Sequence, residues 1–266
     1  MKRIAVLTAL LFTALQIGYA QKVGLVLSGG GAKGAAHIGV IKALEENGIP
    51  IDYITGTSAG AIVGSLYAMG YTPEEMVELM LSEEFSYWQT GTVENEYKYY
   101  FKRPDPTPEF GHFSIDMTDS LQVKASFLPQ SLINPIQMNQ AFMALFSQAT
   151  AKAGWNFDNL FVPFRCVASD IYSKKAIIFK NGDLGDAVRA SMTFPFFFQP
   201  IWKDSVPIFD GGIYDNFPVG PMKEAFHPDF IFGSTVAGGN NKPSSNPYNQ
   251  LETMIMQKTD YDVPED

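Results

Sequence analysis

The amino-terminal half of the chain alternates short buried strands with helices, and this alternation constrains the fold more than any other feature. Residues 23–28 (VGLVLS) form an apolar run that ends in glycines, which is typical of a strand buried on both faces. Apolar residues then recur at helical spacing from Ala35 to the stop signal Asn47-Gly48. A second strand at 53–55 and a second helix at 59–69 repeat this order. The pattern predicts an α/β layered fold with a largely parallel sheet.

The second half of the chain is expected to complete the sheet after one irregular excursion. Thr72-Pro73-Glu74-Glu75 is a capping box that predicts the start of a third helix. Residues 85–161 are rich in aromatics, prolines and polar turns, with one helical stretch at 135–149, and we interpret them as an excursion or lid. Regular signals then return, mostly strands with one short helix, at 162–168, 176–179, 184–190, 206–209 and 230–235.

The first twenty residues have the pattern of a removable signal peptide. Lys2 and Arg3 precede an uncharged apolar run at 4–15, and Gly18-Tyr19-Ala20 places small residues where a signal peptidase cuts. A buried first strand or helix is the alternative. The expected product is an exported protein, located in the periplasm, at the outer membrane or secreted. The expected divisions of the chain are a signal peptide at 1–20, one domain at 21–240, and a polar tail or linker at 241–266 cut from a longer protein.

Composition argues against several classes of function. The 266-residue chain has 19 Lys plus Arg against 28 Asp plus Glu, a formal net charge of −9, and no basic cluster. A nucleic-acid partner is therefore not expected. The single cysteine, Cys166, has no partner for an internal disulfide, and no Cys or His cluster has the spacing of zinc ligands. We expect neither a metal nor a cofactor.

The strongest candidate for chemistry is the pentapeptide Gly56-Thr57-Ser58-Ala59-Gly60. It lies between the expected second strand and second helix, which is the context of a nucleophile elbow. The glycines remove Cβ atoms that would clash at a tight turn, and the helix N-terminus directs backbone N–H groups at a developing oxyanion. The alternative is an ordinary turn in which Ser58 only caps the helix.

A glycine-rich turn, Gly29-Gly30-Gly31-Ala32-Lys33-Gly34, also presents backbone N–H groups at a helix N-terminus. A dinucleotide site fits the glycine spacing, but the acidic residue it needs after the second strand is replaced by Thr55-Gly56, and Asp52 lies at the wrong end. A P-loop would need Lys then Ser or Thr after the last glycine, where two alanines stand. The third interpretation is an oxyanion hole beside the candidate serine, because adjacent parallel strands bring their C-terminal ends together.

The candidate base is Asp210 in the sequence Asp210-Gly211-Gly212, which ends the strand expected at 206–209. The glycines let the carboxylate project from a crowded turn toward the C-terminal edge of the sheet. A carboxylate that is close and partly desolvated can accept the proton of a serine hydroxyl. The alternative is a plain turn, since Asp-Gly-Gly is a common turn sequence.

Together these segments resemble the patatin-like phospholipase family. The match covers roughly residues 22–240 and keeps the family's order and spacing. It consists of the glycine-rich turn, the Ser58 pentapeptide, Ala190-Ser191-Met192 leading to Pro195 and Pro200, and Asp210-Gly211-Gly212 continuing to Asn216 and Pro218. The resemblance implies a three-layer α/β/α sandwich and a Ser/Asp dyad without histidine, with Ser58 as nucleophile and Asp210 as general base. It also implies an oxyanion hole formed by the 29–34 loop and the Ala59 amide.

The resemblance further implies a substrate class. Family members cleave acyl esters of phospholipids, lysophospholipids or neutral lipids, generally without a metal, and some bacterial members are exported. Phospholipase A or lysophospholipase activity on lipid or lysolipid is therefore expected. Aromatic residues at 194–198 suit an acyl-chain groove, with core packing as the alternative role for each of them. Contact with a membrane surface is expected. The sequence determines neither the lipid head group nor the oligomeric state.

Two alternatives from other classes stay open. A Ser/His/Asp esterase would use His227, which follows Asp210 in the chain order of α/β-hydrolases. An export-associated lipid-binding or structural domain would keep the same turns without turnover.

Overall fold

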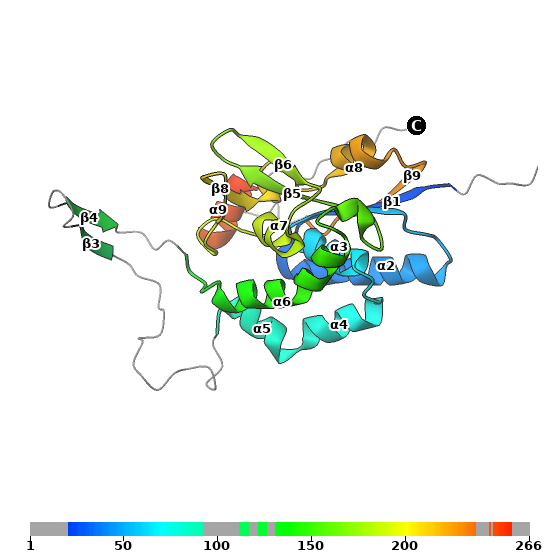
Figure 1. The fold of residues 1–266 in the computed structure, drawn as a ribbon, viewed down its shortest axis with the longest axis horizontal. Coiled ribbons are helices and arrows are strands. Elements are labelled where there is room, and N and C mark those ends of the chain that lie inside the picture. Colours follow the sequence, from blue (N-terminus) through cyan, green and yellow to red (C-terminus); the bar gives the residue numbers. More distant parts are fainter. Residues whose placement is uncertain are drawn as a thin grey trace, which may run out of the picture.

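A seven-stranded sheet with helices on both faces forms the centre of the computed structural model (Figure 1). The structure describes residues 21–92, 112–116, 122–126, 131–237, 245 and 247–256. The expected signal peptide at 1–20 lies outside these residues, as do parts of the expected excursion and tail.

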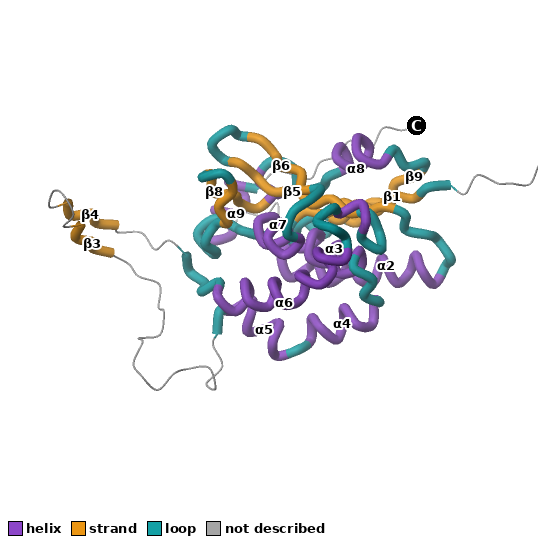
Figure 2. Tube along the Cα trace, viewed as in Figure 1, coloured by secondary structure: helices purple, strands orange, loops and turns teal. Residues whose placement is uncertain are grey.

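The strands follow the order β7-β8-β5-β2-β1-β9, with β6 also paired to β5. Figure 2 shows the strands in orange and the helices in purple. Their bounds are β1 Val23–Leu27, β2 Tyr53–Thr57, β5 Phe164–Asp170, β6 Lys175–Phe179, β7 Ile201–Lys203, β8 Val206–Asp210 and β9 Phe230–Ser234. Strands β9, β1, β2 and β5 are parallel, as expected. Strands β6, β8 and β7 are antiparallel to their neighbours. The β5–β6 and β7–β8 connections are short, and a short connection permits only antiparallel pairing.

Side chains alternate across β1 and divide the interior into two layers. Leu25 and Leu27 belong to the main core on one face, whereas Val26 packs against Val219 and Met222 on the other. The main core is covered by α2, α3, α4 and α6, and the second face by α8 (Figure 1). The helices are α2 Ala36–Glu46, α3 Ala59–Ala68, α4 Pro73–Leu81, α5 Glu83–Thr90, α6 Ile136–Lys152, α7 Leu184–Ser191, α8 Val219–Phe226 and α9 Pro247–Ile255. The expected α/β/α layering is confirmed.

Helix α6 belongs to the core rather than to an excursion. Its Met138, Phe142, Phe146 and Thr150 repeat every four residues and are all buried, as one face of a helix requires. The interpretation of 85–161 as a single excursion or lid is therefore wrong for this helix. Farther out, β3 His112–Asp116 and β4 Gln122–Ser126 form a separate antiparallel pair.

The predicted capping box opens α4. The Thr72 hydroxyl accepts the Glu75 N–H at 3.2 Å, and a Glu75 carboxylate oxygen accepts the Thr72 N–H at 2.8 Å. Two of the N–H groups at the start of this helix are thereby satisfied. Within the tail expected at 241–266, residues 247–255 form α9, and the Met256 side chain after it lies close to Gly212.

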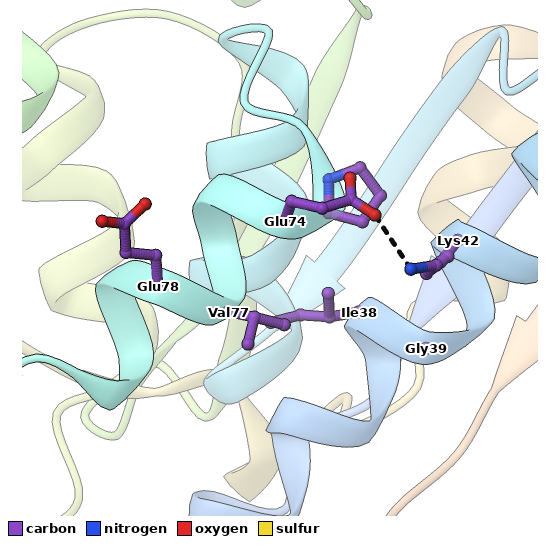
Figure 3. A pocket seen from close by; sticks show the side chains of 7 residues that line it. Ile38, Gly39, Lys42, Glu74, Val77 and Glu78 are labelled. Carbon is purple, nitrogen blue, oxygen red and sulfur yellow. Dashed lines mark hydrogen bonds and ion pairs between the residues drawn. The ribbon is translucent and has the colours of Figure 1, made fainter.

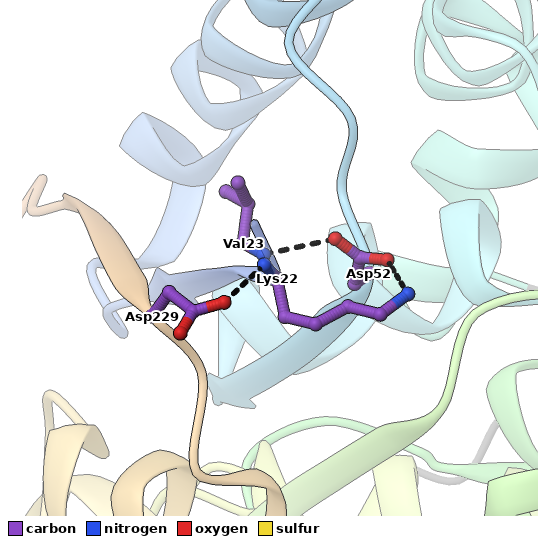
Figure 4. Close-up of polar contacts among 4 residues, drawn as sticks. All are labelled: Lys22, Val23, Asp52 and Asp229. Atoms are coloured by element: carbon purple, nitrogen blue, oxygen red, sulfur yellow. Dashed lines mark hydrogen bonds and ion pairs between the residues drawn. The ribbon is translucent and has the colours of Figure 1, made fainter. Parts of the chain in front are cut away.

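The carboxylates of Asp52 and Asp229 accept hydrogen bonds from the backbone at the start of β1 (Figure 4). The glycine-rich turn follows the other end of this strand. The Lys22 N–H donates to Asp229 Oδ2 at 2.7 Å, and the Val23 N–H donates to Asp52 Oδ2 at 2.9 Å. The Lys22 Nζ lies 2.6 Å from Asp52 Oδ1. Asp52 therefore serves the beginning of a strand, which agrees with the argument against a dinucleotide site.

Candidate active site

Ser58 stands at the turn between β2 and α3 with a strained backbone. Its φ is 53° and its ψ is −118°, a combination that residues with a side chain rarely adopt. A Cβ on Gly60 would collide with the carbonyl oxygen of Leu27, and one on Gly56 would collide with the carbonyl oxygen of Gly60. Only glycines allow β1, β2 and α3 to approach one another this closely.

The Ser58 hydroxyl points at a buried carboxylate. Its Oγ donates to Asp210 Oδ2 at 2.7 Å. Asp210 ends β8 and is 2% exposed, and Ser58 is 9% exposed. The other carboxylate oxygen of Asp210 accepts the Gly212 N–H at 2.8 Å, within the short helix η4 Gly211–Ile213. One oxygen is thus held by the backbone while the second faces the serine proton.

These two residues meet because β2 and β8 follow one another along the same edge of β5. Thr57, the residue before the serine, pairs with Val167 of β5. Asp210 pairs with Ala168, the next residue of β5. Strand β6 pairs with β5 over both of these positions and so takes the opposite edge. The end of a parallel strand and the end of an antiparallel strand are thereby brought together.

The glycine-rich turn lies against the turn that carries Ser58. A Cβ on Gly29 would come within 3.1 Å of the Ser58 Cβ, and one on Gly34 would collide with the Ala59 Cβ. Ala32 and Lys33 are exposed, and residues Gly31–Ala35 form the short helix η1 before α2. Among the described residues, no hydrogen-bond acceptor occupies the N–H groups of Gly30, Gly31 and Ala59. Three backbone donors therefore remain available beside Ser58.

The buried His37 is hydrogen-bonded to Ser28, the residue before the glycine-rich turn. The His37 ring bonds the Ser28 carbonyl oxygen through Nε2 at 2.9 Å and the Ser234 hydroxyl through Nδ1 at 2.8 Å. Burial lowers the pKa of His37, which favours the neutral ring. The Ser28 hydroxyl in turn accepts the Val236 N–H at 2.9 Å. The sequence places His37 in the first helix, but its contact with the turn depends on β9.

Asp215 and Asn216 connect the glycine-rich turn to the Asp210 turn. The Asn216 carbonyl oxygen accepts the Gly29 N–H at 3.2 Å, and the Asn216 side chain is packed against Gly29 and Gly212. Its Oδ1 is buried and has no hydrogen-bond partner among the described residues. Burial raises the pKa of the Asp215 carboxyl to about 6, and the N–H of Phe217 partly offsets this effect.

His227 lies far from the serine. It ends α8 in the left-handed conformation, with φ 48° and ψ 51°. Three residues later β9 begins at Phe230, which pairs with Val23 at the start of β1. Because Ser58 follows the C-terminal end of β2, His227 and Ser58 stand at opposite ends of the parallel strands. The arrangement gives no support to a Ser/His/Asp triad.

Other residue types that could carry chemistry are not grouped in the part of the chain that the structure describes. No set of three or more His, Cys, Asp or Glu side chains there could hold a metal ion. Cys166 is buried in β5, and burial raises the pKa of its thiol. None of the described helices combines the length and hydropathy needed to cross a bilayer.

The aromatic residues at 194–198, expected to suit an acyl-chain groove, have different environments. Phe198 is buried, with the Arg189 guanidinium 5.0 Å from its ring centroid. Phe194 and Phe197 pack edge to face, with centroids 5.5 Å apart. Phe196 is half exposed. Phe198 therefore serves packing, and Phe196 alone of these four is among the exposed hydrophobic residues.

A separate shallow groove lies between α2 and α4, away from Ser58 (Figure 3). Its polar side chains include Lys42 and Glu74, whose Nζ and Oε1 are 2.9 Å apart. The apolar part of its lining is Ile38, Pro73 and Val77. The groove lining contains no Ser, Thr, Cys or His side chain, and we assign it no chemistry.

Comparisons with known proteins agree with the motifs. A family model described as patatin-like phospholipase matches residues 25–223. The lysophospholipase NTE1 of Pyricularia oryzae is 31% identical over 217 residues, which cover 81% of this chain and 12% of that protein. A patatin-like phospholipase domain-containing protein of Caenorhabditis elegans is 29% identical, with 76% of this chain and 12% of that protein covered. The chain thus spans about an eighth of the length of these relatives. The matches agree with the expected enzyme class, a carboxylic ester hydrolase acting on lipids.

Among solved structures, VipD from Legionella pneumophila is similar with a TM-score of 0.49 and 16% sequence identity. The similarity covers 88% of this chain and 52% of VipD.

The expectation of an exported protein in the periplasm, at the outer membrane or outside the cell is wrong. The similar curated relatives are eukaryotic, namely fungal lysophospholipases of the NTE1 type and a nematode patatin-like phospholipase domain-containing protein. A short apolar run behind two basic residues is a feature of local composition, and such a pattern is not specific to export.

Proposed function

This chain belongs to the patatin-like phospholipase family, and on that premise we propose that it hydrolyses lipid esters with Ser58 as nucleophile and Asp210 as general base. The observation that carries the proposal is the 2.7 Å hydrogen bond from Ser58 Oγ to Asp210 Oδ2. A serine hydroxyl becomes a useful nucleophile when a nearby base accepts its proton, and this carboxylate is both close and buried.

The proposed reaction has two proton transfers in each half. Asp210 takes the proton as Ser58 Oγ attacks the ester carbonyl, and returns it to the leaving alcohol when the acyl–oxygen bond breaks. Asp210 then takes a proton from water, which attacks the acyl-enzyme, and returns it to Ser58 Oγ as the fatty acid leaves. Each half passes through a tetrahedral oxyanion that needs donors already in position. The unoccupied N–H groups of Gly30, Gly31 and Ala59 are the proposed donors.

The proposed substrate is a phospholipid or a lysophospholipid cleaved at its carboxylic ester, at or near a membrane surface. Relatives named lysophospholipase support the lysolipid as the first substrate to test. The position of His227 at the far end of the sheet argues for a dyad rather than for a triad esterase. A lipid-binding domain without turnover would not need a buried carboxylate hydrogen-bonded to a serine at a strained turn.

Ser58→Ala and Asp210→Asn test the dyad. We expect each to lower kcat on a soluble ester by at least about a thousandfold, because the members of a catalytic unit fail together. Asparagine keeps an oxygen that can accept the Gly212 N–H, so folding should be preserved. A fluorophosphonate should label the wild-type protein at Ser58 and leave Ser58→Ala unlabelled.

The matched control is Ser65→Ala. Ser65 is a buried serine of the same helix, α3, and its hydroxyl bonds only the Ile62 carbonyl oxygen at 2.9 Å. We expect this variant to keep the wild-type rate and labelling. If Ser58→Ala retained more than a tenth of the wild-type rate, the proposed nucleophile would be wrong. Assays of diacyl phospholipid against lysophospholipid, with equal head groups, identify the better substrate.

A further inference from the structure

The end of α7 carries a motif to which the proposed chemistry assigns no role. Ala190-Ser191-Met192 belongs to the sequence resemblance, yet none of its side chains is one of the proposed reacting groups. Ser191 is completely buried, so it has no access to a substrate. Its hydroxyl nevertheless lies in contact with the nucleophile elbow.

The Ser191 hydroxyl bridges two backbone groups that the sheet leaves unpaired. It accepts the Ser58 N–H at 2.9 Å and donates its single hydrogen to the Val167 carbonyl oxygen at 2.6 Å. The β2–β5 register ends at the pair of Thr57 with Val167, where a continuing strand would bond the next N–H to the Val167 carbonyl oxygen directly. The hydroxyl therefore stands in for the missing backbone hydrogen bond. It also occupies the Ser58 N–H, which leaves the proposed oxyanion donors to neighbouring residues.

The same segment also holds the proposed base. The Thr193 carbonyl oxygen accepts the Asp210 N–H at 2.8 Å. Thr193 is anchored by Arg189, whose Nη1 donates to Thr193 Oγ1 at 2.6 Å and whose Nη2 donates to the Gln199 carbonyl oxygen at 3.1 Å. Only one residue, Met192, thus separates the residue that holds Ser58 from the residue that holds Asp210.

We propose that Ser191 is a positioning residue that keeps Ser58 in its strained conformation and in register with Asp210. This inference rests on the proposed function of Ser58 and Asp210. Without the hydroxyl, the Ser58 N–H and the Val167 carbonyl would both be buried and unpaired, a state that proteins avoid. The elbow would relax toward an ordinary backbone conformation, and the Ser58 Oγ would leave its position beside Asp210 Oδ2.

Ser191→Ala tests this role by a split between kinetic constants. Because Ser191 is inaccessible to substrate, we expect KM on a soluble ester to stay within about threefold of wild type. We expect kcat to fall about 10- to 100-fold, as for a reacting group displaced by about 1 Å. The rate of fluorophosphonate labelling at Ser58 should fall with kcat. All measurements are made well below the thermal midpoint of the variant.

Thr150→Val is the matched control for loss of a buried hydroxyl. The Thr150 hydroxyl, on α6, accepts the Leu184 N–H at 3.2 Å at the other end of α7 and has no contact with Ser58. Valine has the same shape but lacks the oxygen, so this variant should lose stability and keep the wild-type kcat. A merely structural role for Ser191 would make the two variants alike.

The proposal is overturned if Ser191→Ala keeps kcat within twofold of wild type, or loses no more activity than Thr150→Val. The failure of the dyad itself is recognised separately, because Ser58→Ala would then retain activity. In that case a crystal structure of Ser191→Ala still decides the positioning claim. We expect Ser58 to leave the positive φ region there, and a retained φ near 53° would contradict the inference.

Discussion

At the scale of single residues, the site contains two carboxyls in different environments. Asp210 has hydrogen-bond partners, whereas burial disfavours the charged form of Asp215. Asp210 receives hydrogen bonds from the Ser58 hydroxyl and from the Gly212 N–H. Asp215, five residues later, contributes its backbone carbonyl oxygen to the Thr57 hydroxyl at 2.9 Å, while its carboxyl is mostly desolvated. The two carboxyls have similar distances from the elbow in sequence but different environments, and environment sets the pKa.

Asp215 should make the folded protein less stable as the pH rises from about 4 to about 6. Its pKa is raised to about 6 in the folded state and is near 3.9 in an unfolded chain, so between these values the folded state binds more protons. The contribution of Asp215 to stability is fully present at a pH below its pKa in the unfolded chain. This contribution is lost as the pH rises through its pKa in the folded protein. Relative to wild type, Asp215→Asn should therefore gain on the order of 2 kcal/mol of unfolding free energy between pH 4 and pH 6.

Urea unfolding of both proteins at pH 4, 5 and 6 measures this difference. Other acids titrate equally in the two proteins and cancel in the comparison. The hydrogen bond to Thr57 uses the backbone of residue 215 and is preserved in the variant. If the unfolding free energies of Asp215→Asn and wild type differed by the same amount at all three pH values, burial of this carboxyl would have no energetic consequence.

At the scale of elements, the site depends on close contact between β1, β2 and α3. Helix α3 starts directly after Ser58, and Gly60 places its first turn against the end of β1. A Cβ added to Gly64, one turn later, would lie only 2.9 Å from the Ile54 side chain of β2. Small residues thus let the helix N-terminus lie near the sheet edge, where its N–H groups lie beside the proposed reaction centre.

Gly60→Ala should destabilise the fold by about 1–3 kcal/mol, because its Cβ would meet the backbone of Leu27 and Ser28 rather than a flexible side chain. Gly39→Ala is the matched control in α2, since no heavy atom lies within 4 Å of a Cβ there. This control should gain about 0.5–1 kcal/mol, as alanine replaces glycine in an exposed helix. Thermal unfolding ranks the three proteins, and an equal Tm for Gly60→Ala and wild type would contradict the packing argument.

At the scale of the whole molecule, the site lies where a parallel half-sheet meets an antiparallel one. The four parallel strands supply the glycine-rich turn and the elbow at their C-terminal ends. The antiparallel strand β8 delivers Asp210 to the same place from the other direction.

Hydrolysis of a soluble ester should therefore persist within about twofold in the presence of EDTA, since the proposed donors are backbone N–H groups and not a metal ion. The described part of the chain contains no cluster of three metal-binding side chains. Initial rates before and after chelation are the measurement. A loss of activity that added Ca²⁺ restores would contradict the proposed mechanism.

Several short elements could not be predicted from the sequence. Strand β7 has only three residues, and α8 contains Gly220 and Pro221, which are poor helix formers. Helix α9 follows a polar stretch that is typical of a linker. Strand β7 is too short to show an alternating pattern, although its partner β8 follows it directly. Helix α8 packs against β1, which is distant in the chain, and such neighbours leave no local pattern.

The features that could be predicted from the sequence depend on neighbouring residues: the buried strands, the capped helices, the glycine-rich turn, and the turns at Ser58 and Asp210. Local sterics and hydrogen bonds control these features, and a few residues are enough to specify them. The edge of β5 that receives β8 is set by the assembled sheet, and so is the contact between Ser58 and Asp210, which are 152 positions apart. The Ser191 bridge spans 133 positions and likewise exists only once the sheet has assembled. Pairing between distant strands depends on the whole core, because no short segment can specify its partner alone.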